Sequence, residues 1–336
     1  MREALYYRKK KGNTITCGLC PKQCVIEEDR TGFCRVRENR GGVLYALNYG
    51  RCSSCSVDPM EKKPLYHFYP AHTILSFGTY GCNLRCGFCQ NWEIAHGSPP
   101  TVNVAPDAVV PMLRAQGQRC VAVAYTYSEP VVWYEFIYDT ARLVKAAGFK
   151  NVLVTNGMIN EAPFRELLPY IDAVNIDVKS FRDEYYVKYC AGRLKPVLET
   201  VARAHEICHV EVTTLIVTGL NDSEEEFGEL AAWLGGLDPD IPLHFSRYFP
   251  NFELDLPPTP PQTLYRARDL ARKSLRYVYL GNVRDEDAGN TYCPVCGAVV
   301  IRREGYRVRG SAFKDGKCTD CGATIPIVGT VWEERA

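Results

Sequence analysis

The sequence predicts an α/β fold in which a partial (β/α)6 TIM-type barrel lies between two small cysteine-rich modules. From Thr73 onward, strand-like runs of β-branched and aromatic residues alternate with amphipathic stretches, a pattern typical of a parallel sheet covered by helices. Before Pro70 and after Asp285 the chain changes to short segments that contain Gly, Cys and Arg. The 336 residues are enough for about two domains of ~150 residues each, or for one barrel with additions.

Six strands alternate with helical stretches in the central region. The predicted strands are Thr73–Phe77, Cys120–Tyr125, Asn151–Thr155, Ala173–Val178, Val210–Val217 and Leu243–Tyr248. The predicted helical stretches are Asp107–Gln116, Val131–Ala147, Ala162–Leu168, a long one within Arg182–Ile207, Glu224–Leu234 and Thr263–Ser274, followed by a run at Tyr277–Leu280. Ligands of parallel sheets bind beyond the carboxyl ends of the strands, so residues that follow each strand are the candidates for chemistry.

We therefore divide the chain into three predicted regions. Residues 1–70 form an N-terminal cysteine-rich module for a metal or cluster, residues 71–285 form the barrel, and residues 286–336 form a zinc-ribbon-like module. No apolar run approaches the ~20 residues of a membrane span, and the first residues do not resemble a secretory signal. With 40 Lys and Arg against 39 Asp and Glu, the net charge is +1. We expect a cytoplasmic protein that binds neither membranes nor nucleic acid.

Cysteine is the unusual component of the sequence. There are sixteen cysteines, thirteen of them in tight clusters, while Cys120, Cys190 and Cys208 stand alone. In a reducing compartment, clustered thiols are more often metal ligands than disulfides. The three isolated cysteines are expected to be small buried side chains with no further role.

The loop after the first predicted strand carries Cys82, Cys86 and Cys89 in C-x3-C-x2-C spacing, with Phe88 before the third. A structural zinc site or a closed cluster takes four ligands, whereas a [4Fe–4S] cluster held by three cysteines leaves one iron open to a small ligand. The alternative is a zinc site completed by a distant fourth residue. The three-cysteine interpretation predicts a reaction site, with these cysteines as its catalytic centre.

This spacing, in this position of a barrel, resembles that of radical S-adenosylmethionine (SAM) enzymes. The resemblance implies that SAM chelates the open iron. One electron then cleaves SAM to methionine and a 5′-deoxyadenosyl radical, which abstracts hydrogen from a substrate. It also implies SAM contacts after the later strands. These candidates are Tyr127, Ser128 and Glu129 in place of a Gly-Gly-Glu segment, Asn156 after the third strand, Asp177 and Lys179 after the fourth, Thr213 on the fifth and His244 on the sixth.

Several of these candidates have a structural alternative. Glu129 at the start of a helix is also ordinary capping chemistry, and Asn156 lies in an Asn-Gly turn. Asp177 and Lys179, on one face of a strand, would also make an ion pair, and His244 would serve as a satisfied core histidine.

Three stretches together resemble a narrower family. Asp58–His67, Gly81–Trp92 and Ser246–Pro250 are similar to AmmeMemoRadiSam-system radical enzymes, which are relatives of pyruvate formate-lyase activating enzyme. The resemblance implies Memo-like and AMMECR-like partner proteins, a reductant such as ferredoxin or flavodoxin, and a protein or peptide substrate. Without the family, Glu61-Lys62-Lys63 is expected to be a solvated charged loop.

The N-terminal region contains a second cysteine set, Cys17, Cys20, Cys24 and Cys34. Four thiolates make a closed site, and the spacing leaves an auxiliary [4Fe–4S] cluster and a zinc ion as alternatives. A separate pair, Cys52 and Cys55, fits spare ligands, a redox dithiol or a turn, and we assign it no role.

The C-terminal cysteines Cys293, Cys296, Cys318 and Cys321 form two Cys-x2-Cys-Gly knuckles with 21 residues between them. This spacing is typical of a zinc ribbon, with rubredoxin-type iron as the rival. The arginines between the knuckles, Arg302, Arg303, Arg307 and Arg309, are expected to form a solvated face.

Two functions of different classes fit these motifs. The first is a radical SAM enzyme with an unidentified substrate. The second is a non-enzymatic iron–sulfur or zinc adaptor that carries electrons or binds RNA. An electron carrier needs neither an open iron nor a substrate-sized barrel mouth, so the enzyme is favoured.

Overall fold

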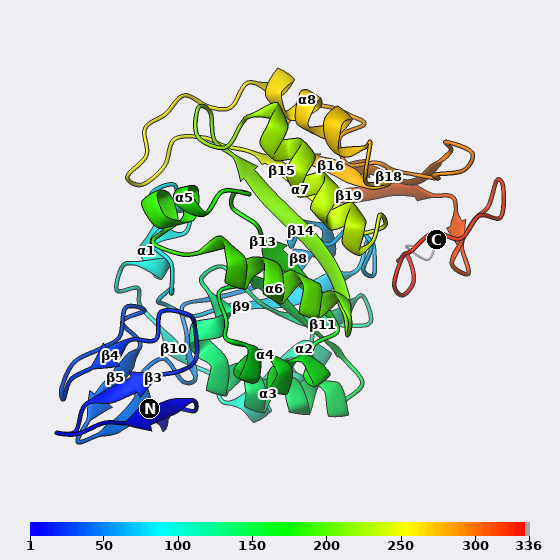
Figure 1. Ribbon diagram of the computed structural model, residues 1–336. Coiled ribbons are helices and arrows are strands. Elements are labelled where there is room, and N and C mark those ends of the chain that lie inside the picture. The colour runs from blue at the N-terminus through cyan, green and yellow to red at the C-terminus, as the bar shows by residue number, and fades with distance from the viewer. Residues whose placement is uncertain (333–336) are drawn as a thin grey trace.

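The computed structural model describes residues 1–332 (Figure 1). Its centre is an eight-stranded sheet with the order β16-β15-β14-β13-β12-β11-β9-β8. The parallel strands are β9 (Thr73–Gly78), β11 (Cys120–Tyr125), β12 (Lys150–Thr155), β13 (Ala173–Asp177), β14 (His209–Ile216), β15 (Leu243–Arg247) and β16 (Val278–Gly281). At one edge, β8 (Ser54–Pro59) pairs antiparallel with β9. The predicted central parallel sheet is therefore present.

The sheet has seven parallel strands rather than the predicted six. The run that sequence analysis places after the sixth unit forms β16, in which Val278 pairs with Leu243 of β15. Two parallel neighbours need a crossover connection, and α8 (Pro261–Ala271) supplies it.

Helices cover the outer face of the sheet, as Figure 1 shows. They are α2 (Val109–Arg114), α3 (Tyr134–Ala146), α4 (Glu161–Leu167), α6 (Leu194–His205), α7 (Glu224–Leu237) and α8. The long helix predicted within residues 182–207 is broken into α5 (Asp183–Tyr185), a π-helical turn (Tyr186–Cys190) and α6. The break follows from the left-handed backbone of Ala191, whose φ of 51° no helix accommodates.

The remaining elements are short. The N-terminal region has β1 (Arg2–Glu3), β2 (Tyr7–Lys9), β3 (Ile15–Cys17), β4 (Val25–Ile26), β5 (Arg37–Arg40), β6 (Val43–Ala46) and β7 (Arg51–Cys52), the last paired with β10 (Val102–Asn103). The C-terminal region has β17 (Thr291–Tyr292), β18 (Val299–Glu304), β19 (Arg307–Ser311), β20 (Phe313–Lys314) and β21 (Lys317–Cys318). Single helical turns lie at α1 (Trp92–Ala95), Met60–Lys62, Pro106–Ala108, Pro130–Trp133 and Leu168–Tyr170.

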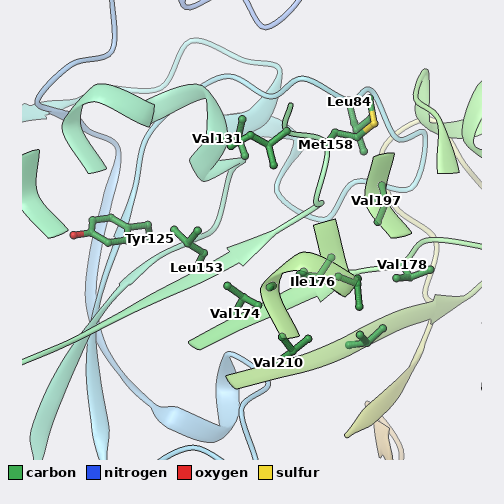
Figure 2. Close-up of a cluster of buried hydrophobic side chains, with 14 of the residues drawn as sticks. Leu84, Tyr125, Val131, Leu153, Met158, Val174, Ile176, Val178, Val197 and Val210 are labelled. Carbon is green, nitrogen blue, oxygen red and sulfur yellow. The ribbon is translucent and has the colours of Figure 1, made fainter. Parts of the chain in front are cut away.

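The sheet separates two apolar clusters. Most buried residues, including Leu153 and Val174, belong to a large cluster that Figure 2 shows in part. On the other face, small strand residues such as Ala122 and Ala124 leave room for Met60, Leu65 and Phe68. Residues 60–70, here called the inner segment, therefore fill the inside of the curved sheet, and their burial stabilises the barrel.

The C-terminal region is hydrogen-bonded to this inner segment. Val328 donates its backbone N–H to His67 (2.8 Å) and accepts one from Tyr69 (2.8 Å), and Trp332 donates to Pro70 (3.0 Å). Residues 333–336 of the predicted ribbon module lie outside the described residues. Within residues 1–332, no helix is both long enough and apolar enough to cross a membrane.

Candidate active site

The candidate active site lies at the carboxyl end of the parallel sheet. The cysteine loop (Gly81–Asn91), which carries Cys82, Cys86 and Cys89, follows β9, and the loops after β11 and β12 lie beside it. Asn91 Nδ2 donates to the Tyr127 carbonyl (2.8 Å). Asn156 Nδ2 donates to Asn83 Oδ1 (2.9 Å). The amide side chains of Asn91 and Asn156 thus connect the cysteine loop to the loops after β11 and β12, as the sequence predicts for residues that follow parallel strands.

Backbone hydrogen bonds fix the middle of the cysteine loop. The N–H groups of Arg85 and Gly87 donate to the carbonyls of Cys190 and Tyr189, at 2.8 and 3.0 Å. These carbonyls are presented by the π-helical turn, and such irregular turns are frequent at functional sites. The break in the predicted long helix therefore has a role in holding the loop.

Apolar packing fixes the start of the loop. Leu84 is buried beside Met158, as Figure 2 shows, and Asn83 Nδ2 donates to the Met158 carbonyl (2.6 Å). Just before Cys82, Gly81 has a φ of 91°, and a Cβ there would lie 2.7 Å from the carbonyl oxygen of Cys34. Only glycine fits this conformation and this close approach.

Of the three cysteines of the loop, Cys86 is buried, and Cys82 and Cys89 are half-buried. Burial raises the pKa of Cys82 well above its usual value and that of Cys89 to about 11. A hydrogen bond with Cys190, together with burial, raises the pKa of Cys86. All three are therefore protonated at neutral pH in the metal-free protein, so binding of iron would release protons. Sequence analysis assigns no role to Cys190, but its thiol is hydrogen-bonded to that of Cys86.

The loop after β11 takes a conformation that normally requires glycine. Tyr127 has a φ of 70°, in the left-handed region, where the resembling Gly-Gly-Glu segment has a glycine. Such a backbone costs a non-glycine residue about 1–3 kcal/mol and persists only where its surroundings hold it. Here Asn91 binds the Tyr127 carbonyl, and Ser128 Oγ donates to Thr79 (2.7 Å).

Glu129 is buried and hydrogen-bonded within the chain. Its carboxylate accepts the N–H of Val131 (3.0 Å), the hydroxyl of Thr155 (2.6 Å) and the N–H of Asn156 (2.8 Å). Burial raises its pKa to about 7, against the lowering effect of these donors. Glu129 therefore caps the turn that follows it and joins two site loops, while a direct SAM contact stays a prediction.

Asp177 and Lys179 lie on one face after β13 and make an ion pair of 2.7 Å. Their side chains keep 32% and 16% of their surface exposed, so the pair remains accessible. Burial alone would lower the pKa of Lys179, but the nearby Asp177 and Cys86 raise it above its usual value. Both residues also act on the pKa of Cys89, which places the pair beside the cysteine loop.

The last two predicted SAM contacts, Thr213 and His244, are register partners on the adjacent strands β14 and β15. Thr213 is buried, and its hydroxyl donates to Asn175 Oδ1 (3.0 Å) on the same face as Asp177. His244 is the second residue of β15, and its Nε2 lies 2.6 Å from a carboxylate oxygen of the buried Glu211. His244 therefore belongs to a buried hydrogen-bonded network at the same level of the sheet as Thr213 and Asp177, and its contact with SAM stays a prediction.

The inner segment brings a second group of charges into the barrel. Asp58 binds Lys63 Nζ (2.5 Å), Lys62 Nζ (2.8 Å) and the Tyr127 hydroxyl (2.5 Å). Burial lowers the pKa of Lys63 to about 8. Lys63 and Glu61 are buried, and Lys62 alone is largely exposed. The expected solvated charged loop is therefore wrong for Glu61 and Lys63, because folding buries each of them beside a charged partner, Arg303 for Glu61 and Asp58 for Lys63.

Cys17, Cys20, Cys24 and Cys34 line one cavity in the N-terminal region, together with Lys22, Arg37 and Asn83. The sixteen cysteines are all free thiols. Cys52 and Cys55 are separate from this cavity, with Cys52 buried and Cys55 exposed on β8.

The C-terminal cysteines make a compact set. The Sγ atoms of Cys293 and Cys321 are 3.6 Å apart, and those of Cys296 and Cys318 are 3.8 Å apart. Four thiolates at ~2.3 Å from one tetrahedral zinc ion would be about 3.8 Å from each other. These residues therefore fit a single metal ion.

One arginine of the expected solvated face is buried instead. Arg303 donates to the Tyr66 carbonyl (2.7 Å) and to the Thr291 hydroxyl (2.8 Å). Its Nε lies 3.6 Å from Glu61, and both side chains are fully buried. Arg302, Arg307 and Arg309 are exposed as expected, whereas Arg303 joins the ribbon to the inner segment.

Comparison with known proteins supports this architecture. Residues 77–234 match the family model described as the Radical SAM superfamily. The chain is 43% identical over 337 residues to an uncharacterized protein of Methanocaldococcus jannaschii, covering 98% of this chain and 100% of that protein. It is 30% identical over 159 residues to the pyruvate formate-lyase-activating enzyme of Clostridium pasteurianum, covering 45% of this chain and 65% of that enzyme.

Solved structures show the same fold. The chain has a TM-score of 0.51 and 14% sequence identity with Streptococcus suis SuiB bound to S-adenosylmethionine, covering 67% of this chain and 53% of SuiB. The matched superfamily region contains the cysteine loop and every strand from β11 to β14. The chain therefore contains a radical SAM domain with homology to pyruvate formate-lyase activating enzymes, and along nearly its whole length it is a relative of the Methanocaldococcus protein.

Proposed function

We propose that this protein cleaves SAM reductively at a [4Fe–4S] cluster held by Cys82, Cys86 and Cys89, and that it abstracts hydrogen from a substrate. The observation that carries the proposal is the set of three thiols on one anchored loop, at the carboxyl end of the parallel sheet. The superfamily implies a [4Fe–4S] cluster and SAM, and three thiolates match a cluster with one open iron. When bound, these groups supply methionine and a 5′-deoxyadenosyl radical.

The surrounding residues would bind and orient SAM. Asp177 and Lys179 are accessible and lie beside the cysteine loop, so they suit the charged amino-acid part of SAM. Glu129 and Asn156 hold the neighbouring loops, with Asn156 Nδ2 at 3.7 Å from Cys82 Sγ. Burial of the loop would exclude water from a reactive radical.

Replacement of Lys179 by Ala, or of Asp177 by Asn, is expected to weaken SAM binding by about 10-fold, because each change removes one charge of the pair next to the cluster. Binding is measured by isothermal titration of the anaerobic, cluster-loaded protein. The visible iron–sulfur absorption should be unchanged, since neither residue is a proposed ligand of iron.

Lys195→Ala is the matched control, because this lysine on α6 is 87% exposed and lies outside the site. Its SAM affinity should equal that of the unchanged protein. Loss of iron from either site variant would show that the ion pair supports the cysteine loop rather than SAM.

The C-terminal cysteines are proposed to hold one zinc ion structurally. All four positions of the tetrahedron are filled by protein, which leaves none for a substrate. Replacing Cys296 and Cys321 by Ala is expected to remove about one equivalent of zinc per chain and to lower the thermal unfolding midpoint. Metal analysis checks the first result and calorimetry the second, and redox-active iron in place of zinc would show a rubredoxin-like site.

The remaining proposals rest on resemblance. The Asp58–His67 and Ser246–Pro250 stretches support membership of the AmmeMemoRadiSam-system branch, with Memo-like and AMMECR-like partners. Relation to activating enzymes supports a protein or peptide substrate and a ferredoxin or flavodoxin as reductant. The free thiols suit the reducing cytoplasm.

A further inference from the structure

We propose that Cys17, Cys20, Cys24 and Cys34 hold a second [4Fe–4S] cluster rather than a zinc ion, and that it passes electrons to the cysteine loop. The electron-carrying role rests on the proposed function, but the identity of the N-terminal metal does not. The cavity that the four thiols share is lined mainly by apolar residues, with Lys22, Arg37 and Asn83 as its other polar residues.

Backbone N–H groups point at all four sulfur atoms. Phe33 donates to Cys24 Sγ at 3.4 Å. The backbone of Leu19, Lys22 and Val36 makes the corresponding bonds with Cys17, Cys20 and Cys34. Bonds of this kind orient ligands and tune a thiolate-bound metal.

Arg37 supplies positive charge to the cavity wall. Its side chain is 1% exposed and binds both carboxylate oxygens of Glu135, at 2.7 and 2.8 Å. Its Nε has no hydrogen-bond partner among residues 1–332. Buried donors are almost always paired, so this unpaired donor, on a residue that lines the cavity, would suit an added acceptor. A centre with four thiolates provides such an acceptor.

The spacing of the thiols distinguishes a cluster from a single ion. Within residues 1–332, the ribbon cysteines are the one group of three or more potential ligands whose donor atoms all lie within 4.8 Å of one another. The four N-terminal thiols, which line one cavity, do not come this close together, and neither do the three thiols of the cysteine loop. A zinc ion draws its thiolates to about 3.8 Å from each other, whereas a four-iron cluster spreads them over a larger body.

The N-terminal site adjoins the cysteine loop. Asn83, next to Cys82, lines the N-terminal cavity. Gly81 approaches Cys34 so closely that a Cβ would lie 2.7 Å from the Cys34 carbonyl oxygen. Lys22 lies near Cys20, Cys24 and Cys82 at once. The two thiol sets are therefore neighbours in space.

This proximity gives the second cluster a role. A low-potential donor of the ferredoxin or flavodoxin class would give up one electron, and the N-terminal cluster would accept it. The cluster is oxidised again when the cysteine-loop site takes that electron. No atom or proton moves, so the step is balanced with one donor electron for each SAM cleaved.

Metal analysis tests the proposal on the full chain, purified and reconstituted anaerobically. The unchanged protein should hold about eight irons, eight sulfides and one zinc. Cys20→Ala with Cys24→Ala should lower iron to about four and leave zinc unchanged. Cys52→Ser with Cys55→Ser is the control and should lose no metal. Two zinc ions and four irons in the unchanged protein would overturn the proposal.

A second variant keeps the proposal testable if the first variant does not fold. Cys82, Cys86 and Cys89 replaced together by Ala should retain about four irons with the Mössbauer spectrum of a [4Fe–4S] cluster. Loss of all iron there would overturn the proposal. In the reduced unchanged protein, two neighbouring paramagnetic clusters should broaden each other's electron paramagnetic resonance signals, and each variant should show a single unbroadened signal. Eight irons without SAM cleavage would contradict the proposed function alone.

Discussion

Cys86→Ser is expected to abolish formation of 5′-deoxyadenosine from SAM. The change removes one of three thiolates proposed to hold the cluster, and a serine hydroxyl is a poor ligand for iron at neutral pH. Changes beyond the direct ligands already cost ~10–100-fold in metal sites, so we expect a loss of at least ~100-fold. The measurement is quantification of 5′-deoxyadenosine and methionine by mass spectrometry, with dithionite as the reductant.

Two other cysteines make this experiment specific. Cys208→Ser, a half-buried cysteine outside the site, should leave cleavage unchanged. Cys190→Ser is more stringent, because the Cys190 thiol is hydrogen-bonded to that of Cys86. It should keep both the iron and most of the activity. If it lost both, Cys190 would be a fourth thiolate ligand, and the site would have no open iron.

Arg303→Met is expected to destabilise the fold by about 3–5 kcal/mol, because it leaves a buried carboxylate without its partner. Arg303 and Glu61 are both fully buried, and the N–H of Ala71 also donates to the Glu61 carboxylate, at 3.0 Å. Burial raises the pKa of Glu61 and Arg303 opposes that rise, so the variant should raise it further. Urea unfolding of the metal-loaded protein measures the loss.

The loss should depend on pH with a defined sign. A carboxyl whose pKa is higher in the folded state stabilises the fold while it is protonated, and this contribution falls as pH rises from its unfolded pKa of ~4.3 toward the raised value. The loss in free energy of unfolding caused by Arg303→Met should therefore grow from pH 5 to pH 8. Arg302→Met, an exposed neighbour on β18, should change stability by less than ~0.5 kcal/mol. Equal effects of the two variants would contradict the buried ion pair.

Local sequence predicts much of the fold. All six predicted strands begin and end within one residue of the observed strands, because alternation of apolar residues reflects burial that each strand experiences along its own length. The helix predicted within residues 182–207 is present as α6, but the sequence pattern does not predict the π-helical turn before it, whose carbonyls bind the cysteine loop.

Some features of the candidate site can likewise be predicted from the sequence, and others cannot. The cysteine spacings, and the appearance of Asp177 and Lys179 on one face, depend on neighbours a few residues apart and are visible in the sequence. The surroundings of Glu61 and His244 are not, because each depends on a partner far away in the sequence, Arg303 for Glu61 and Glu211 for His244.

The sequence by itself thus determined the parallel sheet, the three cysteine sets and the superfamily resemblance, because these follow from short-range periodicity and ligand spacing. Only the tertiary structure decided which charges are buried. Arg303 makes an ion pair with Glu61, which lies more than 240 residues earlier in the sequence. The backbone of Cys34 in the N-terminal region packs closely against Gly81 of the cysteine loop. A charged side chain can remain inside the protein only where a partner compensates its desolvation, and that partner is brought near by the folded chain as a whole.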